Sequence, residues 1–184
     1  AGSEVTGLKV SDRVAGYGPL RETQTVSADQ VLLMPANMPW QAAVCYDPAQ
    51  FALQGLRDSH LRLGDTTVVF GLGAIGLITV AMAKLAGAHM VAAVDPIAIR
   101  RRAALDLGAD VALDPLGCDI GSELRKETSK RGVDCAIETS GTASALHQAI
   151  RSTAFGGRVT LVGWYNHQLQ GLNLGEEAHF KIPD

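Results

Sequence analysis

The chain of 184 residues is poor in aromatic residues, in cysteine and in net charge. Phe, Trp and Tyr make up 5% of it, three residues are cysteines, and 16 Lys and Arg against 19 Asp and Glu give a formal net charge of −3. Because the chain has no strongly basic stripe to follow a phosphate backbone, nucleic acid is not an expected partner. The hydrophobic share of 47% is typical of a globular protein and excludes a disordered chain.

The three cysteines lie far apart, at Cys45, Cys118 and Cys135, and form no C-x-x-C pair. This spacing excludes a disulfide framework and a zinc clip built from neighbouring residues. We therefore expect a reducing, cytoplasmic location. The chain also lacks an initiator methionine and a basic-then-apolar leader, which indicates a piece of a longer polypeptide.

Residues 66–83 form an uncharged run of 18 residues, which is long enough to be a candidate for a membrane-spanning helix. Three glycines interrupt this run, Lys84 and His89 follow it, and no Trp or Tyr flanks it as an interfacial anchor. A buried strand that turns into a buried helix explains the run better. No membrane partner is expected.

From residue 66 onward, short apolar runs alternate with longer segments of helical spacing. This alternation predicts β-α-β units and an α/β fold with a doubly wound parallel sheet. The segment beyond Gly163 is polar, so we expect only five strands of this sheet. The expected strands are residues 67–70, 90–94, 111–113, 133–138 and 159–162, and the expected helices are residues 77–85, 97–107, 120–128 and 145–154, the last closed by Gly156 and Gly157.

The first 60 or so residues differ from the rest. Short extended pieces at 13–14, 23–26 and 31–34 are separated by glycines and prolines. This pattern predicts a small β subdomain that the sequence contains only in part.

A G-x-G-x-x-G motif at Gly71, Gly73 and Gly76 directly follows the first of these strands and opens a helix. In that context the first glycine permits a tight turn, the second lets the main chain approach a pyrophosphate, and the third lets the helix pack on the strand. The motif predicts a Rossmann dinucleotide site with the phosphates at the helix N-terminus. A tight turn without a ligand is the alternative.

Asp95 ends the second strand, 24 positions after Gly71. A carboxylate at this place accepts hydrogen bonds from an adenosine ribose and repels a 2′-phosphate, which favours NAD over NADP. Because Pro96 follows, Asp95 also fits a helix N-cap, and the two roles are compatible. Arginines at 100–102 are typical of a solvated helix face. A methyltransferase with a glycine loop is an alternative that the third glycine disfavours.

Four segments then resemble one family. Residues 5–14 are similar to its G-V-x-x-L-K-V-G-D-R-V stretch, residues 64–71 to G-D-x-V-x-V-x-G, residues 134–141 to D-x-x-I-E-x-S-G, and residues 156–163 to G-G-x-x-V-x-V-G. This family is the medium-chain dehydrogenases/reductases, which include zinc alcohol dehydrogenases and sorbitol dehydrogenase. The resemblance implies a partial GroES-like catalytic domain at 1–46 and an NAD(P)-binding Rossmann domain at 47–184 that lacks its last strand.

The resemblance implies an oxidoreductase that transfers a hydride between NAD(H) and an alcohol, polyol or carbonyl compound. The alternative is a non-catalytic nucleotide-binding or redox-sensing module on the same fold. Ser140 with Gly141 also fits a plain strand-ending turn, and Val162 also fits a core position. The cofactor-binding residues implied are Gly71, Gly73, Ala74, Ile75, Gly76, Asp95, Arg100, Thr139, Ser140, Val162 and Gly163.

The resemblance also bears on metals and assembly. The four-cysteine lobe that usually follows G-D-R-V is missing, because Val14 runs directly into Ala15, so no structural zinc is expected. Asp47, followed by Pro48, aligns with a Glu-Pro pair at the place of a third ligand of the catalytic zinc, so the resemblance makes Asp47 a candidate metal ligand, but Asp47 also fits a helix N-cap. The other zinc ligands of the family precede this segment, so catalytic zinc stays open. No catalytic acid or base is identified, and the family implies a homodimer or homotetramer with a small-molecule substrate.

Overall fold

The computed structural model describes residues 2, 4–166 and 171. The chain divides into two compact units, Ala1–Asp47 and Pro48–Asp184. Among the described residues, no helix combines the length and the apolar character that a membrane crossing requires.

The second unit contains a five-stranded parallel sheet with the strand order β5-β4-β3-β6-β7. The chain starts in the centre at β3, builds outward through β4 and β5, and then returns to the other side of β3 with β6. This order confirms the predicted doubly wound α/β fold of the Rossmann type. The strands are β3 (Thr66–Phe70), β4 (Met90–Val94), β5 (Val111–Leu113), β6 (Val133–Glu138) and β7 (Thr153–Leu161).

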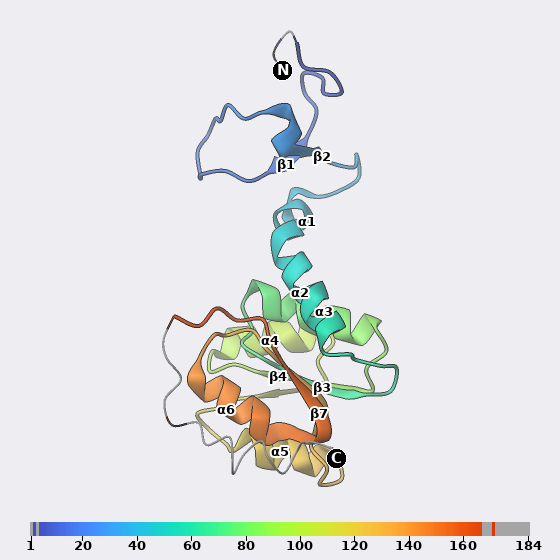
Figure 1. Ribbon diagram of the computed structural model, residues 1–184, viewed down its shortest axis with the longest axis vertical. Helices are drawn as coiled ribbons and strands as arrows, with labels where there is room; N and C mark the ends of the chain where they lie inside the picture. The colour runs from blue at the N-terminus through green and yellow to red at the C-terminus, as the bar shows by residue number, and fades with distance from the viewer. Residues whose placement is uncertain (1, 3, 167–170, 172–184) are drawn as a thin grey trace. The chain divides into compact units, whose positions relative to one another are not determined.

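Helices cover both faces of this sheet (Figure 1). Successive residues of a strand point to opposite faces, so Val69 packs into one core and Val68 into the other. The first core takes side chains from α2, α3 and α4, and the second takes them from α5 and α6. The helices are α2 (Tyr46–Asp58), α3 (Ala74–Leu85), α4 (Ala98–Asp106), α5 (Ile120–Glu127) and α6 (Ala143–Ser152).

The end of α6 differs from the prediction. The helix stops at Ser152, and Gly156 and Gly157 lie inside β7 instead of closing the helix. The pairing of β6 with β7 shifts register between Val133 and Cys135, so the glycines form an irregularity in the strand. A Cβ on Gly157 would lie 2.9 Å from the Asp134 carbonyl oxygen, which explains why glycine is needed there.

The N-terminal unit holds a small two-stranded antiparallel sheet. Strand β1 (Val14–Gly16) pairs with β2 (Val31–Leu33), and a 3-10 turn at Ala28–Gln30 precedes the second strand. The helix α1 (Trp40–Val44) follows. The predicted extended piece at 23–26 does not form a strand, because it has no pairing partner among the described residues.

Candidate functional site

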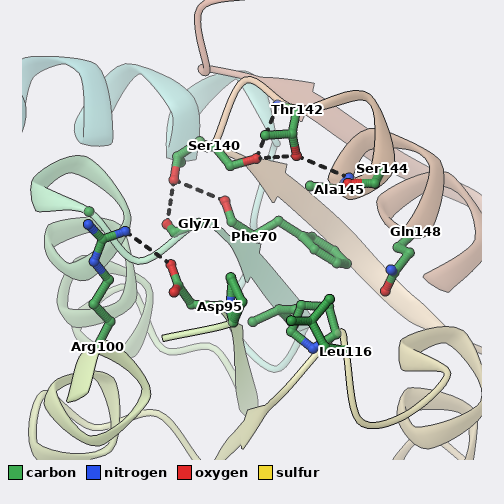
Figure 2. A pocket seen from close by; sticks show the side chains of 15 residues that line it. Phe70, Gly71, Asp95, Arg100, Leu116, Ser140, Thr142, Ser144, Ala145 and Gln148 are labelled. Atoms are coloured by element: carbon green, nitrogen blue, oxygen red, sulfur yellow. Dashed lines mark hydrogen bonds and ion pairs between the residues drawn. The ribbon is translucent and has the colours of Figure 1, made fainter. Parts of the chain in front are cut away.

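A cavity of about 560 Å³ opens at the carboxyl ends of β3, β4 and β6, where the order of the strands reverses (Figure 2). Ligands of open α/β sheets bind at such switch points, and the volume lies within the range of roughly 300–1,000 Å³ that is usual for ligand pockets. Six of the predicted residues line the cavity, and nine more share it. The lining residues are Phe70, Gly71, Gly73, Val94, Asp95, Pro96, Arg100, Pro115, Leu116, Thr139, Ser140, Thr142, Ser144, Ala145 and Gln148.

The three motif glycines have three different surroundings. Gly71 has a φ of +87°, and a Cβ there would lie 2.7 Å from the backbone nitrogen of Ser140. A Cβ on Gly76 would lie 1.8 Å from the Gly71 carbonyl oxygen, so α3 packs directly on the turn. A Cβ on Gly73 would meet no atom within 4 Å. The fold therefore requires Gly71 and Gly76, whereas Gly73 leaves free space beside the cavity.

The N-terminus of α3 reaches this space at Gly73, whereas the predicted residues Ala74, Ile75 and Gly76 are not among those that line the cavity. Gly73 is the N-cap and offers no side-chain cap, and the first backbone bond of the helix runs from the Leu77 nitrogen to the Gly73 carbonyl. The N–H groups of Ala74, Ile75 and Gly76 have no intrahelical acceptor, as in the first turn of any helix. No acidic residue lies in this turn. The turn thus suits an anion such as a pyrophosphate.

Asp95 lies beside the glycine loop with only 3% of its surface exposed. Its Oδ2 accepts a hydrogen bond from the Leu72 nitrogen, and its Oδ1 accepts one from the Ile97 nitrogen, both at 2.8 Å. The N-cap role is wrong, because α4 begins at Ala98 with Ile97 as its cap. Each carboxylate oxygen has a second lone pair, so Asp95 can still accept ribose hydroxyls while it fixes the loop.

The three arginines of α4 do not share one solvated face. Arg100 lines the cavity, with its Nη1 atom 3.6 Å from Oδ2 of Asp95. Arg101 donates to the Asp95 carbonyl oxygen at 2.7 Å and pairs with Asp114, whereas Arg102 is mostly exposed. The expectation of a purely solvated run therefore holds for Arg102 alone. A positive charge lies directly beside the predicted ribose carboxylate.

Thr139 and Ser140 follow β6 and line the cavity. The Thr139 hydroxyl donates to the carbonyl oxygens of Phe70 and Gly71, at 3.0 and 2.6 Å, which ties this loop to the glycine turn. Gly141 has a φ of +70°, so the segment is also the strand-ending turn that the sequence allowed. Both readings of this segment describe the same loop.

Val162 and Gly163 do not line this cavity. Val162 is partly buried and packs against the core that contains Leu56 and Ile137. A Cβ on Gly163 would lie 2.3 Å from the Gly141 nitrogen, so the loops after β6 and β7 touch through their backbones. In this structure both residues support the neighbouring loop.

Four polar side chains at or near the cavity did not emerge from the sequence, namely Glu138, Thr142, Ser144 and Gln148. Glu138 is fully buried at the end of β6, and its signal in the sequence is a charged residue that directly follows the apolar residues 135–137. Gln148 lies on α6, and its Oε1 atom is buried without a hydrogen-bond partner. The spacing of Ser144, Ala145 and Gln148 on one helix face could have placed α6 at the cavity (Figure 2).

Asp47 lies in the first turn of α2, not at its N-cap, because the helix begins at Tyr46. Its Oδ1 accepts a hydrogen bond from the Tyr17 hydroxyl, and this bond raises the pKa of Tyr17 above its ordinary value. Within the part of the chain that the structure describes, no group of three or more His, Cys, Asp and Glu could hold a metal ion. The described residues alone thus do not build a zinc site.

The strand order and the cavity at its switch point are those of a Rossmann-type α/β domain, and comparison with known proteins identifies the family. Residues 74–181, more than half of the chain, match the family model described as zinc-binding dehydrogenase. The chain belongs to this family, which confirms the resemblance read from its motifs.

Individual relatives and solved structures are also named as dehydrogenases. The chain is 50% identical over 182 residues to D-guloside 3-dehydrogenase of Escherichia coli (strain K12), covering 97% of this chain and 52% of that protein. It is similar to the structure of the alcohol dehydrogenase TADH from Thermus sp. ATN1, with a TM-score of 0.75 and 30% identity over 83% of this chain and 44% of that one. A zinc-binding dehydrogenase from Sinorhizobium meliloti 1021, bound to NADP, gives a TM-score of 0.70 and 32% identity, over 80% and 43%. The chain spans about half the length of the curated relatives it matches.

Proposed function

We propose that the intact protein is a nicotinamide-dependent dehydrogenase that transfers a hydride between NAD(H) and an alcohol, polyol or carbonyl compound. One observation carries this proposal: a glycine loop with free space at Gly73 and a buried carboxylate at Asp95 meet at one cavity. A non-catalytic module with the same fold is the weaker alternative, because the relatives are named as dehydrogenases.

We assign the residues to parts of the dinucleotide as follows. Gly71, Gly73, Ala74, Ile75 and Gly76 hold the pyrophosphate through backbone N–H groups at the start of α3. Asp95 accepts the ribose hydroxyls, and Arg100 lies near the adenosine. The loops with Thr139, Ser140, Val162 and Gly163 border the nicotinamide half. The bound nicotinamide supplies the carbon that accepts or donates the hydride.

The preference for NAD over NADP rests on Asp95. A buried carboxylate at the ribose repels a 2′-phosphate, and both of its oxygens are held in place by backbone donors. Arg100 acts in the opposite direction, since its guanidinium reaches the same carboxylate and suits a phosphate. Asp95 is the more deeply buried of the two, and its side chain is fixed, so we propose NAD(H) as the cofactor.

For the substrate we propose a secondary hydroxyl of a polyol or sugar ring, oxidised to a ketone. The support is the 50% identity to a protein named D-guloside 3-dehydrogenase. A metal ligand role for Asp47 requires further ligands beyond the described residues, so no catalytic step is assigned to a metal. We further propose that the intact protein is a homodimer or homotetramer and that it lies in the cytoplasm. The free cysteines Cys45, Cys118 and Cys135 support the cytoplasmic location.

The test separates cofactor binding from turnover. NADH and, separately, NADPH are titrated into the chain and followed by their fluorescence, and the intact protein is then assayed with a panel of polyols and glycosides plus NAD. Binding with turnover of at least one secondary alcohol is the expected result. Binding without any turnover supports the non-catalytic module, and absence of binding to NADH and NADPH refutes both functions.

A further inference from the structure

Glu138 is a buried carboxylate with an unusual set of partners. It is 0% exposed, yet no described Lys, Arg or His forms an ion pair with it. Its carboxylate instead accepts four hydrogen bonds. The donors are the Ser140 nitrogen at 2.6 Å and the Ser140 hydroxyl on Oε1, and the Gly141 nitrogen at 3.1 Å and the Tyr165 hydroxyl on Oε2.

These donors come from two different loops. Ser140 and Gly141 belong to the loop after β6, which lines the cavity at Ser140, whereas Tyr165 belongs to the loop after β7. The main chain of Glu138 joins the same two loops, because its carbonyl oxygen accepts from the Val162 and Gly163 nitrogens at 2.8 and 2.9 Å. A single residue thus connects both loops through its side chain and its backbone.

The geometry selects a carboxylate over an amide of the same shape. Each oxygen of Glu138 faces one backbone N–H, from Ser140 or from Gly141, and a backbone N–H cannot become an acceptor. A glutamine would place its NH₂ group against one of these donors in either orientation of the amide. Only the ionised, acceptor-only side chain satisfies both loops.

The carboxylate also fixes the direction of the neighbouring hydroxyl. Because the Ser140 hydroxyl donates to Glu138, its lone pairs face away from the carboxylate. They accept from the Thr142 nitrogen at 3.2 Å, and the two hydroxyl oxygens of Ser140 and Thr142 lie 3.0 Å apart. The hydrogen bonds from Tyr165 on one side, and from Thr142 through Ser140 on the other, therefore both run towards Glu138, which fixes the direction of the hydroxyls beside the cavity.

We propose that Glu138, with Tyr165, is a positioning residue that holds the loops after β6 and β7 at the nicotinamide half of the cofactor. This inference rests on the proposed function, since it assigns that half of the dinucleotide to these loops. Tight contact between the loops supports it: a Cβ on Gly141 would lie 2.2 Å from the Trp164 carbonyl oxygen, so a small shift of one loop displaces the other.

The test compares two ligands that differ at the nicotinamide. NADH contains it, and ADP-ribose lacks it but keeps the pyrophosphate and the adenosine. In Glu138→Gln we expect NADH to bind roughly tenfold more weakly or worse, the change that follows loss of a hydrogen bond to a charged group, with ADP-ribose within about twofold of the wild type. Tyr165→Phe leaves both backbone donors paired, so it should change the ratio of the NADH and ADP-ribose affinities by a smaller factor. If Glu138→Gln does not fold, Tyr165→Phe tests the inference instead.

A second readout needs no ligand. The chain has two tryptophans, so the Trp40→Phe background leaves Trp164, next to Tyr165, as the reporter of the loop after β7. Glu138→Gln in this background should make Trp164 fluorescence less anisotropic. An unchanged ratio of the NADH and ADP-ribose affinities in both variants would overturn the inference while leaving cofactor binding intact. If the wild type binds neither ligand, the proposed function fails with it.

Discussion

The free space around Gly73 predicts that one added methyl group, in Gly73→Ala, changes cofactor binding but hardly changes stability. Gly73 has a φ of −74°, which alanine adopts without strain, and its Cβ would meet no atom within 4 Å. Alanine is a poorer N-cap than glycine, but it also reduces the entropy of the unfolded chain, and these effects of about 0.5–1 kcal/mol oppose each other. The free energy of unfolding of Gly73→Ala should therefore stay within about 1 kcal/mol of the wild type.

Cofactor binding should respond very differently. If the pyrophosphate lies against Gly73, the added methyl group overpacks the contact, which costs about 1–3 kcal/mol. This corresponds to roughly 5- to 150-fold weaker binding of NADH, measured by isothermal titration calorimetry. The matched variant is Gly76→Ala, whose Cβ would lie 1.8 Å from a carbonyl oxygen and which should lower the melting temperature. Wild-type NADH affinity in a folded Gly73→Ala protein would refute the assignment of the phosphates to this loop.

Three further predictions concern single polar groups. Asp95→Ser should lower the ratio of NADH to NADPH affinity by about tenfold, the effect of removing one charge from the ribose site, and an unchanged ratio would mean that Asp95 serves only the loop. Gln148→Met removes a buried oxygen that has no hydrogen-bond partner among the described residues, so it should stabilise the chain by about 1 kcal/mol and raise the melting temperature by about 2–4 °C; a melting temperature below that of the wild type contradicts this. Burial raises the pKa of the Cys135 thiol from 9.0 to about 11, so the folded chain keeps a proton that the unfolded chain releases, and stability should fall between these pH values. Iodoacetamide at pH 8 should accordingly modify Cys135 far more slowly than Cys45 in the folded chain, as read by mass spectrometry.

The centre of the fold was predictable because burial on both faces leaves a simple signal. Strands β4, β5 and β6 have the predicted boundaries, and β3 and β4 are buried at every residue. Continuous apolar runs of this kind are typical of parallel strands covered by helices. The helices predicted to end at residues 85 and 107 end at Leu85 and Asp106, and Gly87 and Gly108, with φ of +88° and +102°, follow these ends.

The sequence was less informative where a residue type serves two geometries. Gly156 and Gly157 fit a helix stop as well as an irregular strand, and only the pairing with β6 decides between them. The Asp95-Pro96 pair fits a helix start, but Ile97 is the N-cap and α4 begins at Ala98. For the glycines the deciding contact comes from a segment remote in sequence, which no local pattern contains.

The acidic residues Asp95 and Glu138 show why a sequence motif identifies only part of what a residue does. Asp95 follows β4 and Glu138 ends β6, the two strands on either side of β3, and each carboxylate accepts hydrogen bonds from backbone N–H groups of adjoining loops on both of its oxygens. Ribose binding alone would explain Asp95, but it gives Glu138 no role. Because Asp95 also holds the Leu72 nitrogen, its serine variant should weaken binding of both dinucleotides. The ratio of the two affinities therefore reports on the ribose, whereas the absolute affinities report on how firmly the carboxylates hold the rim of the cavity.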